Sequence, residues 1–170
     1  MLAEVIRGGG VIINADSQQV YPELRILTAR PSMANEDQVP HRLYGHRRAA
    51  EPYSVALWRD EALAAIAEAE RGDRVPIVVG GTGLYFRALL GGIAEIPDIP
   101  AEIRAEVRER LDRLGSEALY ATLVERDAEA AALLSPGDGQ RVARALEVIE
   151  ATEKPLSAWQ RDAAEGPKLQ

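Results

Sequence analysis

Two short runs of β-branched residues, each passing directly into a turn, constrain the fold of this chain most strongly. The first run, 11–13, leads into the polar residues 14–17, and the second run, 75–79, leads into 80–83, which read Gly-Gly-Thr-Gly. Between the two runs, residues 54–72 place apolar side chains at helical spacing. The order strand, helix, strand is typical of a parallel unit, and we therefore predict an α/β fold with a parallel sheet.

The two predicted strands form an incomplete sheet by themselves. Each strand of a two-stranded parallel sheet has an unpaired edge, and two strands bury little apolar surface. We therefore expect further strands from outside the 170 residues. The segment 18–51 has no sustained period and contains three prolines, so we expect a long loop there. Its two histidines, His41 and His46, would lie about 140° apart on a helix, which favours loop packing over a shared metal.

The chain after residue 96 is predicted to be helical, because no further β-branched run occurs. Gly115 closes the first of the predicted helices, and Asp138 caps the last. These helices span 100–114, 116–126, 128–134 and 140–152. We accordingly divide the chain into an α/β core portion (1–95), an all-helical inserted lobe (96–138) and a helix returning toward the core (139–170).

The composition excludes several kinds of function. The sequence has no cysteine, which rules out a disulfide framework, a thiolate zinc site and a cysteine nucleophile. No apolar run approaches the roughly 20 residues that span a bilayer, and the first residues lack the layout of a secretory signal. We therefore expect a cytoplasmic protein with no membrane partner. The formal charge of −7 argues against binding nucleic acid by bulk electrostatics, so any RNA contact must be local.

The turns after the two strands hold the candidate functional residues. Ligands of open parallel sheets bind outside the carboxyl ends of the strands, so Asp16 and Ser17 should face the same crevice as residues 80–83. Glycines let the main chain approach an anion closely, and the helix that follows offers free N–H groups, so a phosphate-bearing substrate fits. The residues alone are also consistent with a plain tight turn at the glycines and with a capping role for Asp16.

Arginine supplies most of the positive charge, since Lys154 and Lys168 are the only lysines among 20 basic residues. Guanidinium groups suit phosphate because they are planar and donate two parallel hydrogen bonds. Arg104, Arg141 and Arg144 lie on predicted helices that are also rich in glutamate. A solvated, ion-paired helix face is the simpler interpretation of these arginines, and phosphate contact is the alternative.

Several motifs, read in order, resemble those of the tRNA dimethylallyltransferase family. They are Ile-Ile-Asn-Ala-Asp-Ser-Gln-Gln-Val-Tyr (12–21), Thr-Ala-Arg-Pro (28–31), Val-Pro-His (39–41), Tyr-Ser (53–54), Val-Gly-Gly-Thr-Gly-Leu-Tyr (79–85), Gln-Arg-Val-Ala-Arg-Ala-Leu-Glu-Val (140–148) and Lys-Pro-Leu-Ser (154–157). The resemblance covers essentially the whole chain. It implies a P-loop NTPase-like parallel-sheet core with an inserted helical lobe. It also implies transfer of a dimethylallyl group from dimethylallyl diphosphate to N6 of adenosine 37, beside the tRNA anticodon, giving N6-isopentenyladenosine.

The resemblance implies roles for individual residues. Asp16 would be the general base that takes a proton from N6 as N6 attacks the first carbon of dimethylallyl diphosphate. Thr82 would orient the adenosine or the diphosphate, with Gly80 and Gly81 on the diphosphate side. Mg²⁺ is the implied cofactor, and the tRNA anticodon stem-loop is the implied partner. The residues implied to contact tRNA are Asp16, Ser17, Gln18, Gln19, Thr82, Arg104, Gln140, Arg141, Val142, Ala143 and Arg144.

The sequence departs from the family in one important motif. Members begin with a strand and a P-loop of the form Gly-Pro-Thr-Ala-Ser-Gly-Lys, which cradles the diphosphate and helps to hold magnesium, and no such motif occurs here. We therefore expect the 170-residue chain, as a monomer, to have little or no transferase activity by itself. The alternatives at this stage are a P-loop-type nucleotide kinase and a non-catalytic tRNA-binding remnant.

Overall fold

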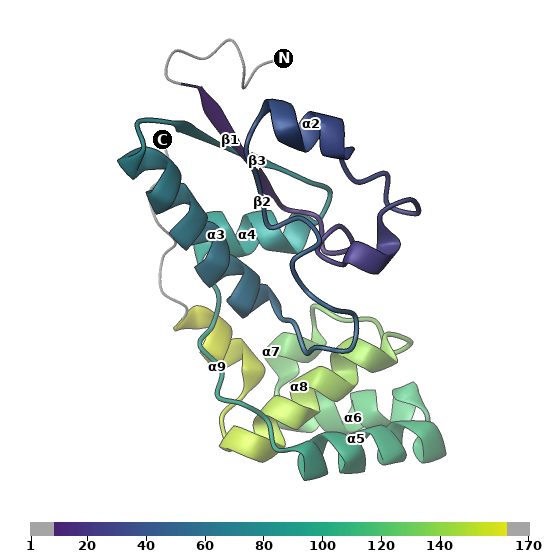
Figure 1. Cartoon of the computed structure of the whole chain (residues 1–170). Coiled ribbons are helices and arrows are strands. Elements are labelled where there is room, and N and C mark those ends of the chain that lie inside the picture. Colours follow the sequence, from purple (N-terminus) through teal and green to yellow (C-terminus); the bar gives the residue numbers. More distant parts are fainter. Residues whose placement is uncertain (1–8, 163–170) are drawn as a thin grey trace. The chain divides into compact units, whose positions relative to one another are not determined.

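The computed structural model describes residues 9–162 of the chain (Figure 1). The described residues divide into two compact units, one ending at Gly92 and the other beginning at Ile93. The first unit contains a parallel sheet with helices, and the second is helical across its described residues. Within residues 9–162, no helix is both long enough and apolar enough to cross a membrane.

The sheet of the first unit has three parallel strands in the order β2-β1-β3. β1 (Gly10–Asn14) lies in the middle, with β2 (His41–Arg42) on one side and β3 (Val75–Val79) on the other. In the register, Ile12 lies opposite both His41 and Ile77. The predicted parallel α/β arrangement is therefore confirmed. β2 was not predicted, because a two-residue strand after Pro40 has no alternating pattern to reveal it.

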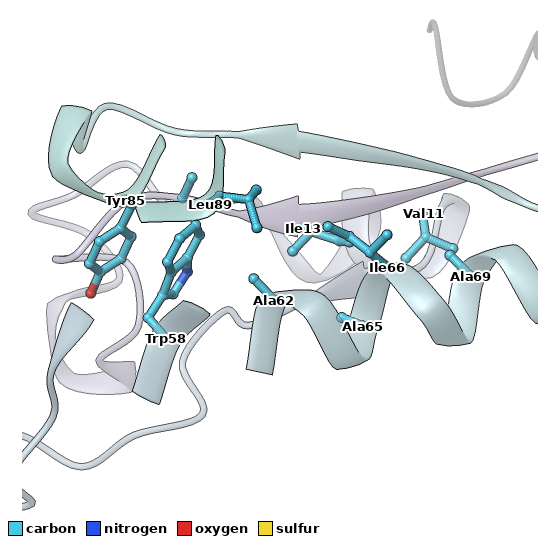
Figure 2. Packing of buried hydrophobic residues seen from close by; sticks show 10 residues of the cluster. Val11, Ile13, Trp58, Ala62, Ala65, Ile66, Ala69, Tyr85 and Leu89 are labelled. Atoms are coloured by element: carbon cyan, nitrogen blue, oxygen red, sulfur yellow. The ribbon is translucent and has the colours of Figure 1, made fainter. Parts of the chain in front are cut away.

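The core of the first unit lies between β1 and two helices, α3 (Val55–Arg71) and α4 (Gly83–Gly91). Ser54 caps α3 by accepting a hydrogen bond from the Leu57 amide, as predicted. The fully buried Trp58 stacks on Tyr85 with 4.1 Å between ring centroids, and Figure 2 shows both rings beside Leu89 of α4. The buried residues of this cluster are Val11, Ile13, Ala15, Trp58, Ala62, Ala65, Ile66, Ala69, Tyr85 and Leu89.

The segment between β1 and α3 is more ordered than the long loop expected from its sequence. It contains the short helix η1 (Pro22–Leu24), the helix α2 (Met33–Gln38) and β2. Ser32 begins α2 through a capping box with Asn35, a pair that the expectation of a loop overlooked. Helices of one or two turns are too short for a repeating pattern of apolar residues to be recognised in the sequence.

The two histidines of this segment pack separately, as their spacing indicated. His41 Nδ1 lies 2.7 Å from the Val39 carbonyl oxygen. His46 Nε2 lies 2.8 Å from a carboxylate oxygen of Glu61 on α3. Burial, together with the charge of Arg47, lowers the pKa of His46 and so favours the neutral form of its ring.

The second unit contains five helices in its described residues: α5 (Ala101–Leu114), α6 (Ser116–Arg126), α7 (Ala128–Ala131), α8 (Gly139–Thr152) and α9 (Leu156–Arg161). α8, which we assigned to a separate segment, packs on α5 and α6 through Val142 and Leu146. Asp138 caps α8 as predicted. α7 is shorter than the predicted 128–134, and α9 was not predicted.

Candidate active site

The carboxyl ends of β1 and β3 lie next to each other and bring the two predicted turns together. Asn14 is opposite Val79 in the register. Beyond the strands, the Ala15 amide donates to the Val79 carbonyl at 2.7 Å, and the Thr82 amide donates to the Ala15 carbonyl at 3.1 Å. The predicted co-location of the polar turn and the glycine turn is therefore confirmed.

The first two glycines of the Gly-Gly-Thr-Gly turn, Gly80 and Gly81, differ in how closely other atoms approach them. A Cβ on Gly80 would lie 2.6 Å from the Asp16 main-chain nitrogen and closer still to the carbonyl group of Ala15. Gly80 is thus required by the close approach of two main chains. A Cβ on Gly81 would lie 3.4 Å from Asp16 Oδ2, which is ordinary contact. Glycine at position 81 leaves the space beside this carboxylate oxygen open.

The Asp16 carboxylate uses one oxygen to shape its own turn. Asp16 Oδ1 accepts hydrogen bonds from the main-chain amides of Gln18 at 2.8 Å and Gln19 at 3.4 Å. This is the turn role that the residues alone allowed. Across residues 9–162 no donor is paired with Asp16 Oδ2, and Asp16 is only half-buried. The second oxygen therefore remains available as a proton acceptor.

Thr82 joins the two turns through its hydroxyl group. Thr82 Oγ1 accepts from the Ser17 amide at 2.9 Å and donates to Ser17 Oγ at 3.2 Å. Although Thr82 stands at the N-cap of α4, its side chain makes no capping bond there. The hydroxyl thus holds Ser17 and Asp16 beside the glycine turn, across 65 residues of sequence.

Asn14, the last residue of β1, was not singled out from the sequence. Its side chain is fully buried, and its amide group bonds to the main chain of Asp16 on both sides. The sequence signal that could have found it is a polar residue at the end of a buried strand. Burying a side-chain amide is unfavourable unless its hydrogen bonds are satisfied, so such a residue indicates specific partners.

Two tyrosines, Tyr44 and Tyr85, lie close enough to Asp16 for its charge to raise their pKa, and Tyr53 lies near Tyr85. Burial raises the pKa of Tyr44, and the negative charges of Asp16 and Glu36 raise it further. Burial also raises the pKa of Tyr53 to about 12, although the nearby Arg47 opposes the shift. For Tyr85 burial again raises the pKa, so no phenolate forms near Asp16.

The predicted tRNA-contacting residues of the second unit differ in exposure and charge pairing. Gln140, Arg141 and Arg144 are exposed, whereas Val142 and Ala143 are buried in the unit's core. Arg141 lies 3.4 Å from an Asp138 oxygen, and Arg144 lies 3.3 Å from a Glu147 oxygen. Arg141 and Arg144 therefore lie on a solvated, ion-paired helix face, which was the simpler interpretation of their sequence.

Arg104 differs from the other two arginines. It lies on the exposed side of α5, and no carboxylate of the described chain pairs with it. Its guanidinium group can bind an external anion without first breaking an ion pair. The phosphate interpretation is accordingly stronger for Arg104 than for Arg141 or Arg144.

The residues at the strand ends do not fit a protein-held magnesium ion. Mg²⁺ takes oxygen ligands and commonly one or two carboxylates. The described residues contain no group of three acidic or histidine side chains that could hold a metal. Asp16 is the sole carboxylate in the turn after β1, and its Oδ1 is occupied by main-chain amides. No catalytic step is therefore assigned to the ion.

Comparison with known proteins identifies the family. The sequence model of IPP transferase matches residues 19–170. The chain belongs to the IPP transferase family. This assignment confirms the resemblance shown by the motifs, and it leaves the nucleotide-kinase alternative without support.

Curated relatives show how far the likeness extends. A tRNA dimethylallyltransferase of Azorhizobium caulinodans is 59% identical over 155 residues, which make up 91% of this chain and 50% of the relative. Another, of Granulibacter bethesdensis, is 55% identical over 159 residues, or 94% of this chain and 50% of the relative. The chain thus spans about half the length of the curated relatives it matches.

A solved structure shares the fold. The structure of a eukaryotic dimethylallyltransferase acting on tRNA matches with a TM-score of 0.76 and 29% sequence identity, covering 94% of this chain and 40% of that chain. The predicted α/β, P-loop-like fold class is therefore confirmed, with the sheet of Figure 1 as the part that carries the candidate site.

Proposed function

We propose that this chain supplies the acceptor-handling part of a tRNA dimethylallyltransferase. In the proposed reaction, N6 of adenosine 37 attacks the first carbon of dimethylallyl diphosphate. The C–N bond forms as the C–O bond to the diphosphate breaks, and the diphosphate leaves with the electron pair. Asp16 takes the proton that N6 loses, which yields N6-isopentenyladenosine. The reaction is proposed to take place in the cytoplasm.

The single observation that carries the proposal is the geometry of Asp16. One carboxylate oxygen is tied to the Gln18 and Gln19 amides, while the other faces the open space that Gly81 leaves. A base held by one oxygen and open at the other can accept a proton without rearranging its turn. An adenosine lifted out of the anticodon loop would present its exocyclic amine to such a carboxylate.

The diphosphate is proposed to bind on the side of Gly80, Gly81 and Thr82. The open space at Gly81 supports this assignment. Mg²⁺ is proposed to accompany the diphosphate as its counter-ion, because phosphate oxygens are its common ligands in such sites. The tRNA is proposed to bind through Asp16 to Gln19, Arg104 and the residues 140–144.

A chimeric enzyme tests the proposed chemistry directly. In the Azorhizobium caulinodans relative, the 155 aligned residues are replaced by the matching residues of this chain. The chimera is expressed in cells lacking their own enzyme, and tRNA nucleosides are measured by mass spectrometry. We expect N6-isopentenyladenosine to appear, and Asp16→Asn to lower its rate of formation about 100-fold or more.

A matched carboxylate serves as the control for this experiment. Asp37 on α2 is exposed, so Asp37→Asn makes the same chemical change away from the strand ends. We expect the Asp37→Asn chimera to be as active as the parent chimera. An Asp16→Asn chimera with undiminished activity would contradict the proposed role of Asp16.

The chain alone is proposed to bind the anticodon stem-loop but to transfer poorly. This second proposal rests on the sequence. Residues 80–83 form the one glycine-rich turn after a β-branched run, and no P-loop motif that would cradle the diphosphate occurs. The measurements are stem-loop binding at low salt and product formation by the 170-residue chain. We expect the chain to bind the stem-loop. We expect it to transfer the dimethylallyl group at least about 100-fold more slowly than the chimera, because the contacts of a P-loop to the diphosphate are missing. Transfer at the chimera's rate would overturn the proposal.

A further inference from the structure

Asn14 makes an unusual set of hydrogen bonds at the end of β1. Its Oδ1 accepts from the Asp16 amide at 2.9 Å. Its Nδ2 donates to the Asp16 carbonyl at 2.9 Å and to the Leu43 carbonyl at 3.1 Å. The orientation of the side-chain amide is unambiguous, since a main-chain N–H only donates and a carbonyl only accepts.

The bond to Leu43 extends the influence of Asn14 to a second segment. Leu43 has a φ of 63°, a left-handed conformation that is unfavourable for a residue with a branched side chain. Such a conformation persists only where neighbouring contacts hold it. Asn14 Nδ2 supplies one of these contacts from inside the core, because Asn14 is fully buried. The loop after β2 and the turn after β1 therefore meet at one side chain.

Aspartate, serine and apolar residues do not reproduce this arrangement. Aspartate at position 14 would lack both donor hydrogens and would bury a charge, while serine is too short to reach three partners. An apolar residue would leave the main-chain N–H and C=O of Asp16 unpaired and would remove one partner of the Leu43 carbonyl. Asparagine fits because it can accept one hydrogen bond and donate two.

We propose that Asn14 is a positioning residue that fixes the Asp16 main chain, so that the carboxylate points one oxygen at the Gln18 and Gln19 amides and leaves the other free for proton transfer. This inference rests on the proposed function of Asp16 as the general base. Asn14 itself does not touch the reacting atoms. It acts through the conformation of the residue that does.

Amide hydrogen exchange in the full 170-residue chain, followed by NMR, tests the positioning without requiring catalysis. In Asn14→Ala, we expect the amides of Asp16 and Gln18 to exchange about ten times faster relative to the amides of β1. The control is Ala62→Gly, which weakens α3 in the same unit without contacting Asp16 and should accelerate all these amides by a common factor. Equal acceleration of Asp16, Gln18 and β1 in Asn14→Ala would overturn the proposal.

A second variant covers the case in which Asn14→Ala does not fold. Asn14→Ser introduces a hydroxyl that can pair with one of the three main-chain groups, and it should show the same selective acceleration to a smaller degree. In the chimera, we expect Asn14→Ala to lower kcat at least tenfold and to leave KM for the tRNA unchanged, whereas Ala62→Gly changes neither. Unchanged kcat in Asn14→Ala would overturn the positioning role. A parent chimera without activity would contradict the proposed function alone, since the exchange rates still decide the positioning of Asp16.

Discussion

Replacing Gly80 by alanine should push apart the two strand ends that form the candidate site. The added Cβ would lie 2.6 Å from the Asp16 nitrogen and closer still to the Ala15 carbonyl group, and non-bonded heavy atoms need about 3.5 Å, so the main chains must separate by more than about 1 Å. The separation would strain the Ala15–Val79 and Thr82–Ala15 hydrogen bonds. Overpacking typically costs about 1–3 kcal/mol and each weakened bond about 1 kcal/mol. We therefore expect the free energy of unfolding of the first unit to fall by about 3 kcal/mol.

Urea unfolding followed by tryptophan fluorescence measures this loss. The chain has two tryptophans, so Trp159→Phe leaves Trp58 as a reporter of the first unit. With a slope of about 1–3 kcal/mol per molar urea, Gly80→Ala should lower the midpoint by about 1–3 M.

A neighbouring glycine provides the control for the Gly80 experiment. A Cβ on Gly83 meets no atom within 4 Å, and alanine there restricts the unfolded chain. Gly83→Ala should therefore raise the free energy of unfolding by up to about 1 kcal/mol. Equal midpoints for Gly80→Ala and Gly83→Ala would refute the argument that close main-chain approach requires glycine at position 80.

Three further predictions follow from single contacts. Arg104→Ala should reduce the slope of log affinity against log salt for the anticodon stem-loop by about one, whereas Arg110→Ala, which removes a guanidinium already 2.8 Å from Glu150, should leave that slope unchanged. Burial raises the pKa of Asp127, but hydrogen bonds from the Ser157 hydroxyl and amide outweigh it and lower this pKa. The ionised Asp127 therefore stabilises the fold above the unfolded-state pKa of about 3.9, and this stabilisation is lost as the pH falls further. Acid unfolding followed through Trp159 should accordingly be less steep in Ser157→Ala. Trp58→Phe should lower the free energy of unfolding by about 2 kcal/mol, measured in urea, because the buried carbonyl at the end of β1 loses its indole donor at 2.8 Å.

The helices and the two longer strands were predictable because their patterns are local. Ser54 and Asp138 cap α3 and α8 where the sequence indicated, since a capping side chain bonds to an amide only two or three residues away. β2 and α9 were not predicted, because two and six residues provide too little period to identify an element. These elements depend on β1 and on the Asp127–Ser157 contact for their stability.

The candidate site was predictable in position but not in its internal contacts. The rule that parallel strand ends share an edge placed Asp16 beside Gly80. The bond of Asn14 to Leu43 was not predictable, because the two residues lie 29 positions apart and Leu43 adopts a left-handed conformation that its side chain does not favour. Local sequence carries no signal for such a partner.

The loop between β1 and α2 is held by hydrogen bonds within itself and to the segment after β2. Gln19 Nε2 donates to the Thr28 carbonyl at 2.9 Å, and the Gly45 amide donates to the Gln19 carbonyl at 2.9 Å. Gly45 has no side chain, and the Arg30 guanidinium occupies that space. Ordering a disordered loop on binding would cost about 1–2 kcal/mol for each residue fixed. Because contacts within the protein already fix this loop, that ordering cost would not be subtracted from the free energy of binding a ligand there.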